Sequence, residues 1–290
     1  MNASWRQLWD ETAPLTGRAE ARWLCEEASG HFGDEFVDVL DVSASHRSVA
    51  HLDAMLARLR TGEPLQYVLG HWSFRRLDLL VDQRVLIPRP ETELVAEHAI
   101  ALLRQLASER PQRPLFVADL GSGSGAIGLS LATELPTGLI EVWLTDISPD
   151  AIDVARANTA GVGMAGANVR FGLGSWFSAL PESLRGDLAL VVSNPPYIGR
   201  DDGGVAAIVR DWEPHAALYA DDDGLADVRE IVHGAVDWLM PGGWLVLEID
   251  SSQRTAVIDL MTSGGLEQVT VRRDLADRDR IAVGRRVRLV

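Results

Sequence analysis

The chain has 290 residues, of which 47% are hydrophobic and 24% charged, a composition typical of a globular protein with one large domain or two smaller ones. Its net charge of −15 argues against a large surface that follows nucleic-acid phosphates. No apolar run approaches the ~20 residues that cross a membrane, and the N-terminus lacks a signal-peptide pattern. The single cysteine, Cys25, excludes an internal disulfide framework, so we expect a cytoplasmic protein.

The basic residues are all arginine, because the sequence contains no lysine. This excludes Schiff-base chemistry and a standard P-loop, both of which need a lysine. The seven histidines show no zinc-ligand spacing with Cys25 or with one another, so we expect no metal site.

Residues 1–65 are expected to be helical, with Thr16 and Ser43 as N-caps. The spacing of Val49, Leu52, Met55, Leu56 and Leu59 predicts one amphipathic helix. We interpret this region as a small helical bundle that serves contact or substrate docking.

Residues 66–92 are interpreted as a hairpin and linker. A change of period predicts short strands from apolar residues at positions 67, 69, 72, 74, 77, 79, 81 and 85. In the segment Ile87-Pro88-Arg89-Pro90-Glu91-Thr92-Glu93, the prolines favour extended backbone, and Pro90 with nearby acids favours a helix start. That helix is expected to end near Leu106.

Residues 93–290 alternate apolar runs typical of buried strands with helical patterns. Strands are expected at 115–120, 140–146, 169–171, 188–194 and 244–247, with helices between them. This alternation predicts a doubly wound α/β sheet. The last two strands, 268–271 and 280–283, are separated by a turn-length segment and should pair antiparallel. A parallel sheet finished by an antiparallel hairpin points to methyltransferases rather than dehydrogenases.

A glycine turn, Gly121-Ser122-Gly123-Ser124-Gly125, follows the first of these strands, where backbone can approach a ligand closely. With Gly128 it also satisfies the G-x-G-x-x-G pattern, which leaves NAD open. Asp146 can accept hydrogen bonds from the ribose of any adenine nucleoside. Asp119 would be unfavourable beside a pyrophosphate but favourable beside the sulfonium and ammonium groups of S-adenosyl-L-methionine.

The strand that begins at Leu188 is stopped by Asn194-Pro195-Pro196-Tyr197, because prolines cannot continue a sheet ladder. The turn lies at the carboxyl end of the strand, where open α/β sheets bind ligands. It offers the Asn194 side chain and the Pro195 carbonyl as acceptors and the Tyr197 ring as a flat wall. This set suits a planar NH2 group, although a strand terminator without function fits the residues about equally well.

Two of these motifs resemble those of known enzymes. The first motif of class I methyltransferases resembles the segment Asp119-Leu120-Gly121-Ser122-Gly123-Ser124-Gly125. The motif of enzymes that methylate exocyclic or amide nitrogens resembles Asn194-Pro195-Pro196-Tyr197. With Ile87–Glu93 and the N-terminal helices, nearly the whole chain resembles the bacterial peptide chain release factor N5-glutamine methyltransferases. Further matching segments are 62–67, 175–177, 213–215, 223–225 and 277–280.

The resemblance implies a Rossmann-like class I methyltransferase sheet with an antiparallel C-terminal hairpin, plus a small N-terminal helical domain joined by a β-hairpin. It implies methyl transfer from S-adenosyl-L-methionine, giving S-adenosyl-L-homocysteine, to the side-chain amide nitrogen (N5) of the glutamine in the Gly-Gly-Gln motif of class 1 peptide chain release factors. We expect a monomer that binds neither nucleic acid nor membrane directly.

Carried over by position, the cofactor-binding residues are Asp119, Gly121, Ser122, Gly123, Ser124, Gly125, Asp146, Trp176 and Asn194. The same resemblance implies that Asn194, Pro195, Pro196 and Tyr197 bind the glutamine, with Asn194, Pro195 and Tyr197 catalytic. One departure is visible, since Asp250 stands where the family commonly has a glycine.

Two other functions stay open. An adenine-N6 methyltransferase of DNA or RNA would use the same pocket but needs a basic surface, and the basic cluster in this sequence is Arg285, Arg286 and Arg288. A non-catalytic Rossmann-like binding module would retain the fold without the chemistry.

Overall fold

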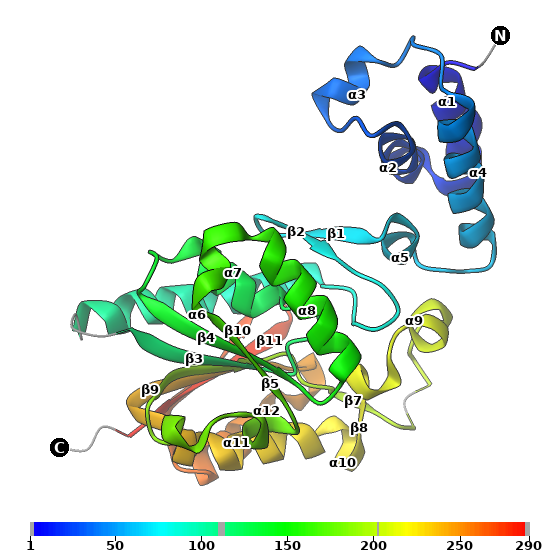
Figure 1. Ribbon diagram of the computed structural model, residues 1–290. Helices are drawn as coiled ribbons and strands as arrows, with labels where there is room; N and C mark the ends of the chain where they lie inside the picture. The colour runs from blue at the N-terminus through cyan, green and yellow to red at the C-terminus, as the bar shows by residue number, and fades with distance from the viewer. Residues whose placement is uncertain (1–2, 110–113, 202, 288–290) are drawn as a thin grey trace. The chain divides into compact units, whose positions relative to one another are not determined.

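The computed structural model describes residues 3–109, 114–201 and 203–287 and divides the chain into two compact units, Met1–His71 and Trp72–Val290. The first unit is helical (Figure 1), with α1 (Trp5–Thr16), α2 (Arg18–Ser29), α3 (Asp34–Asp38), α4 (His46–Arg60) and α5 (Leu65–Leu69). Its core contains Leu24, Phe36, Leu52 and the free Cys25, all buried.

The predicted N-caps of this unit are wrong by position. Thr16 is the last residue of α1, and Ser45 instead of Ser43 caps α4 by accepting a hydrogen bond from the Ser48 amide at 3.1 Å.

The predicted hairpin is present, but it starts later than its apolar pattern suggests. It consists of β1 (His71–Phe74) and β2 (Leu77–Leu80), whereas Tyr67 and Leu69 lie in helix α5. Arg58 donates to the carbonyls of Tyr67 and Val68 at 2.8 and 3.0 Å, which satisfies backbone groups at the end of that short helix.

The second unit is built on a seven-stranded sheet with the order β10-β11-β9-β6-β3-β4-β5. The parallel strands are β3 (Leu115–Leu120), β4 (Ile140–Asp146), β5 (Val169–Leu173), β6 (Leu188–Ser193) and β9 (Leu239–Glu248). The strands β10 (Leu266–Arg273) and β11 (Asp279–Arg286) pair antiparallel with each other, and β11 pairs antiparallel with β9. The predicted methyltransferase-type sheet with an antiparallel end is therefore confirmed.

Helices cover both faces of this sheet (Figure 1). On one face lie α6 (Pro90–Glu109), α7 (Ala126–Glu134) and α8 (Pro149–Gly161), and on the other α11 (Ala226–Trp238) and α12 (Arg254–Ser263). Every residue of β6 is buried, as a central strand covered on both faces requires. Among the described residues, no helix combines the length and apolar character that crossing a membrane requires.

Short elements connect the main helices and strands. They are β7 (Ile198–Gly199), α9 (Ala207–Trp212), β8 (Tyr219–Ala220), α10 (Asp221–Gly224) and the 3-10 turns η1 (Gly163–Asn168), η2 (Trp176–Ala179), η3 (Glu182–Leu184), η4 (His215–Ala217) and η5 (Ser251–Gln253).

Candidate active site

The glycine turn joins the central strand β3 to helix α7. Gly121, Gly123 and Gly125 have φ values of +67°, +53° and +84°, in the left-handed region that favours glycine. The Ser122 amide donates to the Thr145 carbonyl at 2.8 Å, which fixes the turn to the end of β4. The turn therefore exposes backbone at the carboxyl edge of the sheet, as predicted.

Asp146 ends β4 beside this turn. One carboxylate oxygen accepts from the Gly123 amide and the other from the Ser148 amide, each at 2.9 Å. Burial raises the pKa of Asp146, and these two amides oppose that shift. Each oxygen keeps a second lone pair, so the carboxylate can still accept hydrogen bonds from a ligand.

Asp119 lies beneath the turn, and its contacts are with the protein. It is buried and accepts from the Gly128 amide at 2.8 Å, in the first turn of α7. Burial raises the pKa of Asp119 to about 7 against the effect of that amide. A Cβ atom at Gly128 would lie 2.2 Å from Leu144 Cδ2, so this third glycine serves the packing of α7 on β4.

Trp176 closes the turn from the other side. A Cβ atom at Gly121 would lie 3.4 Å from Cζ3 of the Trp176 ring, which places the indole against the turn backbone. Trp176 itself has a φ of +42°, unusual for a residue with a side chain. Burial raises the pKa of Asp227, and a hydrogen bond that the Trp176 side chain donates to this carboxyl opposes the shift. Among the described residues, the buried Ser122 Oγ has no hydrogen-bond partner.

Asn194 follows β6, the neighbour of β3, and so lies at the same edge as the glycine turn. Asp119 pairs with Val192 in the register of the two strands, and Ser193 Oγ donates to the Leu120 carbonyl at 2.6 Å. Asn194 Nδ2 lies 3.4 Å from Thr92 Oγ1. The glycine turn and the turn that begins at Asn194 therefore lie beside each other at the carboxyl edge of the sheet.

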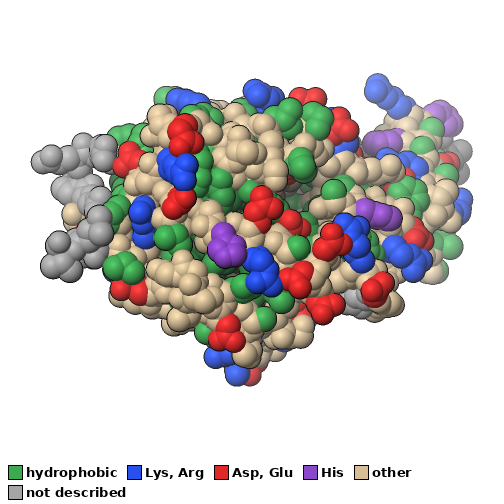
Figure 2. Space-filling model, turned by 90° about the horizontal axis from the view of Figure 1, so that it is seen from below, with side chains coloured by type: hydrophobic (Ala, Val, Ile, Leu, Met, Phe, Trp, Pro, Cys, Tyr) green, Lys and Arg blue, Asp and Glu red, His purple; other side chains and the backbone are tan. Residues whose placement is uncertain are grey.

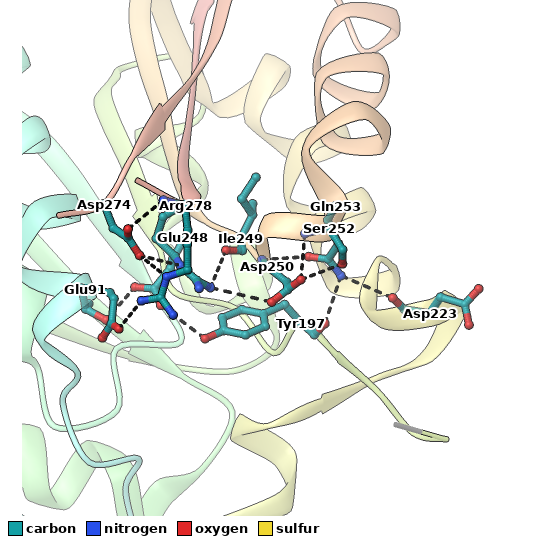
Figure 3. Close-up of polar contacts among 12 residues, drawn as sticks. Glu91, Tyr197, Asp223, Glu248, Ile249, Asp250, Ser252, Gln253, Asp274 and Arg278 are labelled. Carbon is teal, nitrogen blue, oxygen red and sulfur yellow. Dashed lines mark hydrogen bonds and ion pairs between the residues drawn. The ribbon is translucent and has the colours of Figure 1, made fainter. Parts of the chain in front are cut away.

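The Tyr197 side chain and backbone are both held (Figure 3). Gln253 Nε2 donates to its carbonyl at 3.0 Å, and its hydroxyl lies 3.4 Å from Glu248 Oε1. A Cβ atom at Gly224 would lie 2.1 Å from the Tyr197 carbonyl oxygen, so the adjoining loop packs directly against it. Burial raises the pKa of the Tyr197 phenol, with the nearby Glu248 adding to the shift.

Sequence reasoning missed Thr92 and Glu248 as site residues. Thr92 lies in the first turn of α6 and Glu248 ends β9, and Thr92 Oγ1 donates to Glu248 Oε2 at 2.6 Å. Burial raises the pKa of Glu248 to about 7, while the Thr92 hydroxyl and the charge of Arg280 lower it. The feature of the sequence that could have identified Thr92 as a site residue is its position inside the Ile87–Glu93 motif.

That motif is anchored by a third buried acid. Glu213 accepts a hydrogen bond from the Ile87 amide at 3.1 Å and pairs with the Arg89 guanidinium. This contact joins two segments that are more than a hundred residues apart. It fixes the backbone that leads from Ile87 to Thr92.

Charged side chains of both signs are mixed on one face of the molecule (Figure 2). Of the predicted basic cluster, Arg288 lies outside the described residues. On the face shown in Figure 2, acidic and arginine side chains are interspersed, in keeping with the net charge of −15. Within residues 3–109, 114–201 and 203–287, no three histidine, cysteine or acidic side chains are grouped so that they could hold a metal ion.

Comparison with known proteins identifies the family. The methyltransferase small domain model matches residues 97–211. The chain is 40% identical over 275 residues to the release factor glutamine methyltransferase of Coxiella burnetii (strain RSA 493 / Nine Mile phase I), covering 95% of this chain and 94% of the relative. It is 35% identical to that of Escherichia coli (strain K12), with 92% of each chain covered.

Among solved structures, a methyltransferase from Pyrococcus furiosus has a TM-score of 0.51 at 15% identity, covering 81% of this chain and 99% of that one. This likeness supports the fold, whereas the sequence matches extend over both units of the chain. The chain belongs to the release factor glutamine methyltransferase family.

Proposed function

We propose that this protein transfers a methyl group from S-adenosyl-L-methionine to the side-chain amide nitrogen of the glutamine in the Gly-Gly-Gln motif of class 1 release factors. The observation that carries the proposal is the adjacency of the two motifs. Ser193, just before Asn194, is hydrogen-bonded to Leu120, just before Gly121. A methyl donor on the glycine turn and an amide at Asn194 would meet at this edge of the sheet.

The residues around the turn fit S-adenosyl-L-methionine. Asp146 presents a carboxylate suited to ribose hydroxyls, and the Trp176 ring offers an apolar surface beside Gly121 for the adenine side. The unpartnered Ser122 Oγ is a polar atom that a bound ligand would satisfy. The buried Asp119 supplies negative charge beneath a cationic ligand, and the Gly123–Gly125 backbone would line the site. When bound, the cofactor supplies an electrophilic methyl group on a sulfonium.

The acceptor side must overcome the poor nucleophilicity of an amide nitrogen, whose lone pair is delocalised into the carbonyl. In our proposal, Asn194 Oδ1 and the Pro195 carbonyl accept the two amide hydrogens, and Pro196 and the Tyr197 ring wall the pocket. Holding the hydrogens out of plane favours a pyramidal nitrogen with a free lone pair. The same oxygens stabilise the positive charge that develops on nitrogen as the new N–C bond forms and the S–C bond breaks. The methylated, positively charged amide then loses one N–H proton to water, so no general base is needed before the transfer.

We further propose that the helices of residues 1–65 dock the release factor, that residues 66–92 link them to the catalytic part, and that residues 93–290 carry out the transfer. The helical unit carries exposed apolar side chains, among them Val37 and Val42, at 50% and 55% exposure. In our proposal these side chains contact the release factor.

The experiment is to incubate the protein with methyl-labelled cofactor and a class 1 release factor, either native or with its loop glutamine replaced. We expect label on that glutamine and none on the replaced version. Adenine-containing DNA and RNA serve as a second substrate arm. Label on nucleic acid with none on release factor would overturn the proposal in favour of an adenine-N6 methyltransferase.

A further inference from the structure

Glu248, Thr92 and Asn194 form a directional chain of hydrogen bonds at the acceptor side of the site. A threonine hydroxyl has one hydrogen to donate. In the contact of 2.6 Å, Thr92 Oγ1 gives this hydrogen to Glu248 Oε2. Towards Asn194, 3.4 Å away, the same oxygen then has only lone pairs to offer.

This direction decides which end of the Asn194 amide faces the ligand. An acceptor at Thr92 attracts Nδ2, and the opposite end of the amide, Oδ1, is left to point away from Thr92. In the opposite orientation, Asn194 Oδ1 would face the lone pairs of Thr92 Oγ1. The Asn194 NH2 group would then face the NH2 group of the substrate glutamine, so that neither contact could form a hydrogen bond.

We propose that Glu248, acting through Thr92, fixes the side-chain amide of Asn194 so that Oδ1 faces the NH2 group of the substrate glutamine. The proposal rests on the function proposed above and adds a positioning residue to it. Glu248 acts on the reaction only through Thr92 and Asn194.

The direction of the chain depends on an ionised Glu248, because a protonated carboxyl can donate to Thr92 and release the threonine hydrogen towards Asn194. Three titratable or charged groups act on this carboxyl directly: Arg280 on β11, Glu91 on α6 and the Tyr197 hydroxyl after β6. Asp250 and Asp274 each lie 3.9 Å from the Arg280 guanidinium, and the charge of Arg89 acts on Tyr197. Figure 3 shows Glu248 with Glu91, Tyr197, Asp250 and Asp274. Burial is the largest influence and raises the pKa of Glu248 to about 7.

The test measures kcat with a release factor at several pH values for the wild type and for Glu248→Gln, Thr92→Val, Thr92→Ser and the double variant Thr92→Val/Glu248→Gln. We expect Glu248→Gln and Thr92→Val each to lower kcat about tenfold, in line with one oriented hydrogen bond. The glutamine amide can present either its oxygen or its NH2 group to Thr92, so it no longer fixes the direction of the chain. Thr92→Ser keeps the hydroxyl and should stay within about twofold of the wild type. The double variant should be no slower than either single variant, because both break the same chain.

The pH profile gives a readout that a purely structural role would not move. Wild-type kcat should rise as pH increases through about 7, whereas Glu248→Gln should lack this rise. Glu91→Gln is the matched control, since it removes a neighbouring carboxylate that pairs with Arg278 at 2.9 Å and leaves the chain intact. The charge of Glu91 raises the pKa of Glu248. In Glu91→Gln, the midpoint of the rise in kcat should therefore move to lower pH, and the maximal kcat should stay unchanged.

A second readout needs no turnover. In protein labelled with 15N, the Asn194 side-chain amide signal, assigned by its loss in Asn194→Ala, should shift between pH 6 and 8 in the wild type but not in Glu248→Gln. If folded Glu248→Gln has the kcat and the pH profile of the wild type, this inference is overturned while the proposed function stands. The same holds if the losses in kcat of the two single variants add in the double variant. Failure of the wild type to label the glutamine would overturn the proposed function and this inference together.

Discussion

Ser193 and Leu120 are joined by a buried hydrogen bond of 2.6 Å between the serine hydroxyl and the leucine carbonyl. The two residues are 73 positions apart in the chain, and each immediately precedes one of the two turns at the edge of the sheet. Strand pairing alone aligns β3 and β6 only as far as Asp119 and Val192. The side-chain bond extends this alignment by one residue, to the point where Gly121 and Asn194 begin the site.

Replacing Ser193 by alanine should lower kcat and stability together. Loss of one buried hydrogen bond costs about 1–2 kcal/mol of unfolding free energy, and the site loses its alignment as well. Ser130→Ala is the matched control, since Ser130 Oγ is also buried and donates to a carbonyl, that of Ala126 at 2.8 Å, within helix α7. Urea unfolding and initial rates should show stability losses in both variants but a rate loss, beyond any unfolded fraction, in Ser193→Ala only.

Asn194→Ala should lower kcat on the order of 10² to 10³, the effect of deleting one oriented polar group that stabilises charge in a transition state. Initial rates with labelled cofactor measure this directly. Asn168→Ala, in the η1 turn, is the control and should turn over normally. Near-normal turnover of the Asn194 variant would show that the mechanism is wrong.

The strands and both motifs could be predicted because their signals are local. A β-branched run such as the one in β6 is recognisable without its neighbours, and two prolines after Asn194 end it whatever lies around them. The glycine turn likewise follows from residues adjacent in sequence.

Thr92 and Glu248 could not be found in this way. Their contact joins positions 156 residues apart, and each has an adequate local role, one in a helix start and the other at a strand end. Tyr67 and Leu69 show the opposite error, since the same apolar spacing fits either a strand or a short helix. The helix forms here, and Arg58, a residue outside the apolar pattern, satisfies the carbonyls at its end. Local patterns do not record such partners.

Stability should depend on pH through Asp119. Its pKa of about 7 in the folded protein exceeds the ~3.9 of an unfolded aspartate, so its stabilising contribution is full below about pH 4 and is lost as pH rises through about 7. Asp119→Asn removes this group. The raised pKa of Glu248 makes stability fall with pH in the same direction, but Glu248 is present in both the wild type and Asp119→Asn, so its effect cancels in the comparison. Urea unfolding at pH 5 and pH 8 should therefore show the wild type losing more stability than the variant over this interval, and equal losses would contradict the assignment.

Asp250, where the resemblance leads us to expect a glycine, should tolerate replacement by glycine. Its φ and ψ of −71° and 145° are ordinary extended values, and its side chain caps the η5 turn by accepting from the Ser252 amide at 2.9 Å. Glycine is also an acceptable N-cap, so Asp250→Gly should cost less than about 1 kcal/mol and change kcat little. Gln253→Ala is the informative contrast, because Gln253 holds the Tyr197 carbonyl, and it should lower kcat at matched stability. A large rate loss in Asp250→Gly alone would place the function in the aspartate instead.

Docking by the helical unit predicts a change in KM without a change in kcat. Val37 and Val42 are exposed, and serine at both positions removes apolar contact surface without opening the core around Phe36. We expect the double variant to raise KM for the release factor about tenfold, because the transfer site lies in the other unit, and to leave the dissociation constant of the cofactor unchanged. Steady-state rates over a range of release-factor concentrations separate the two constants, and calorimetry measures the cofactor. If KM stays at its wild-type value while both valines are replaced, these side chains do not dock the substrate.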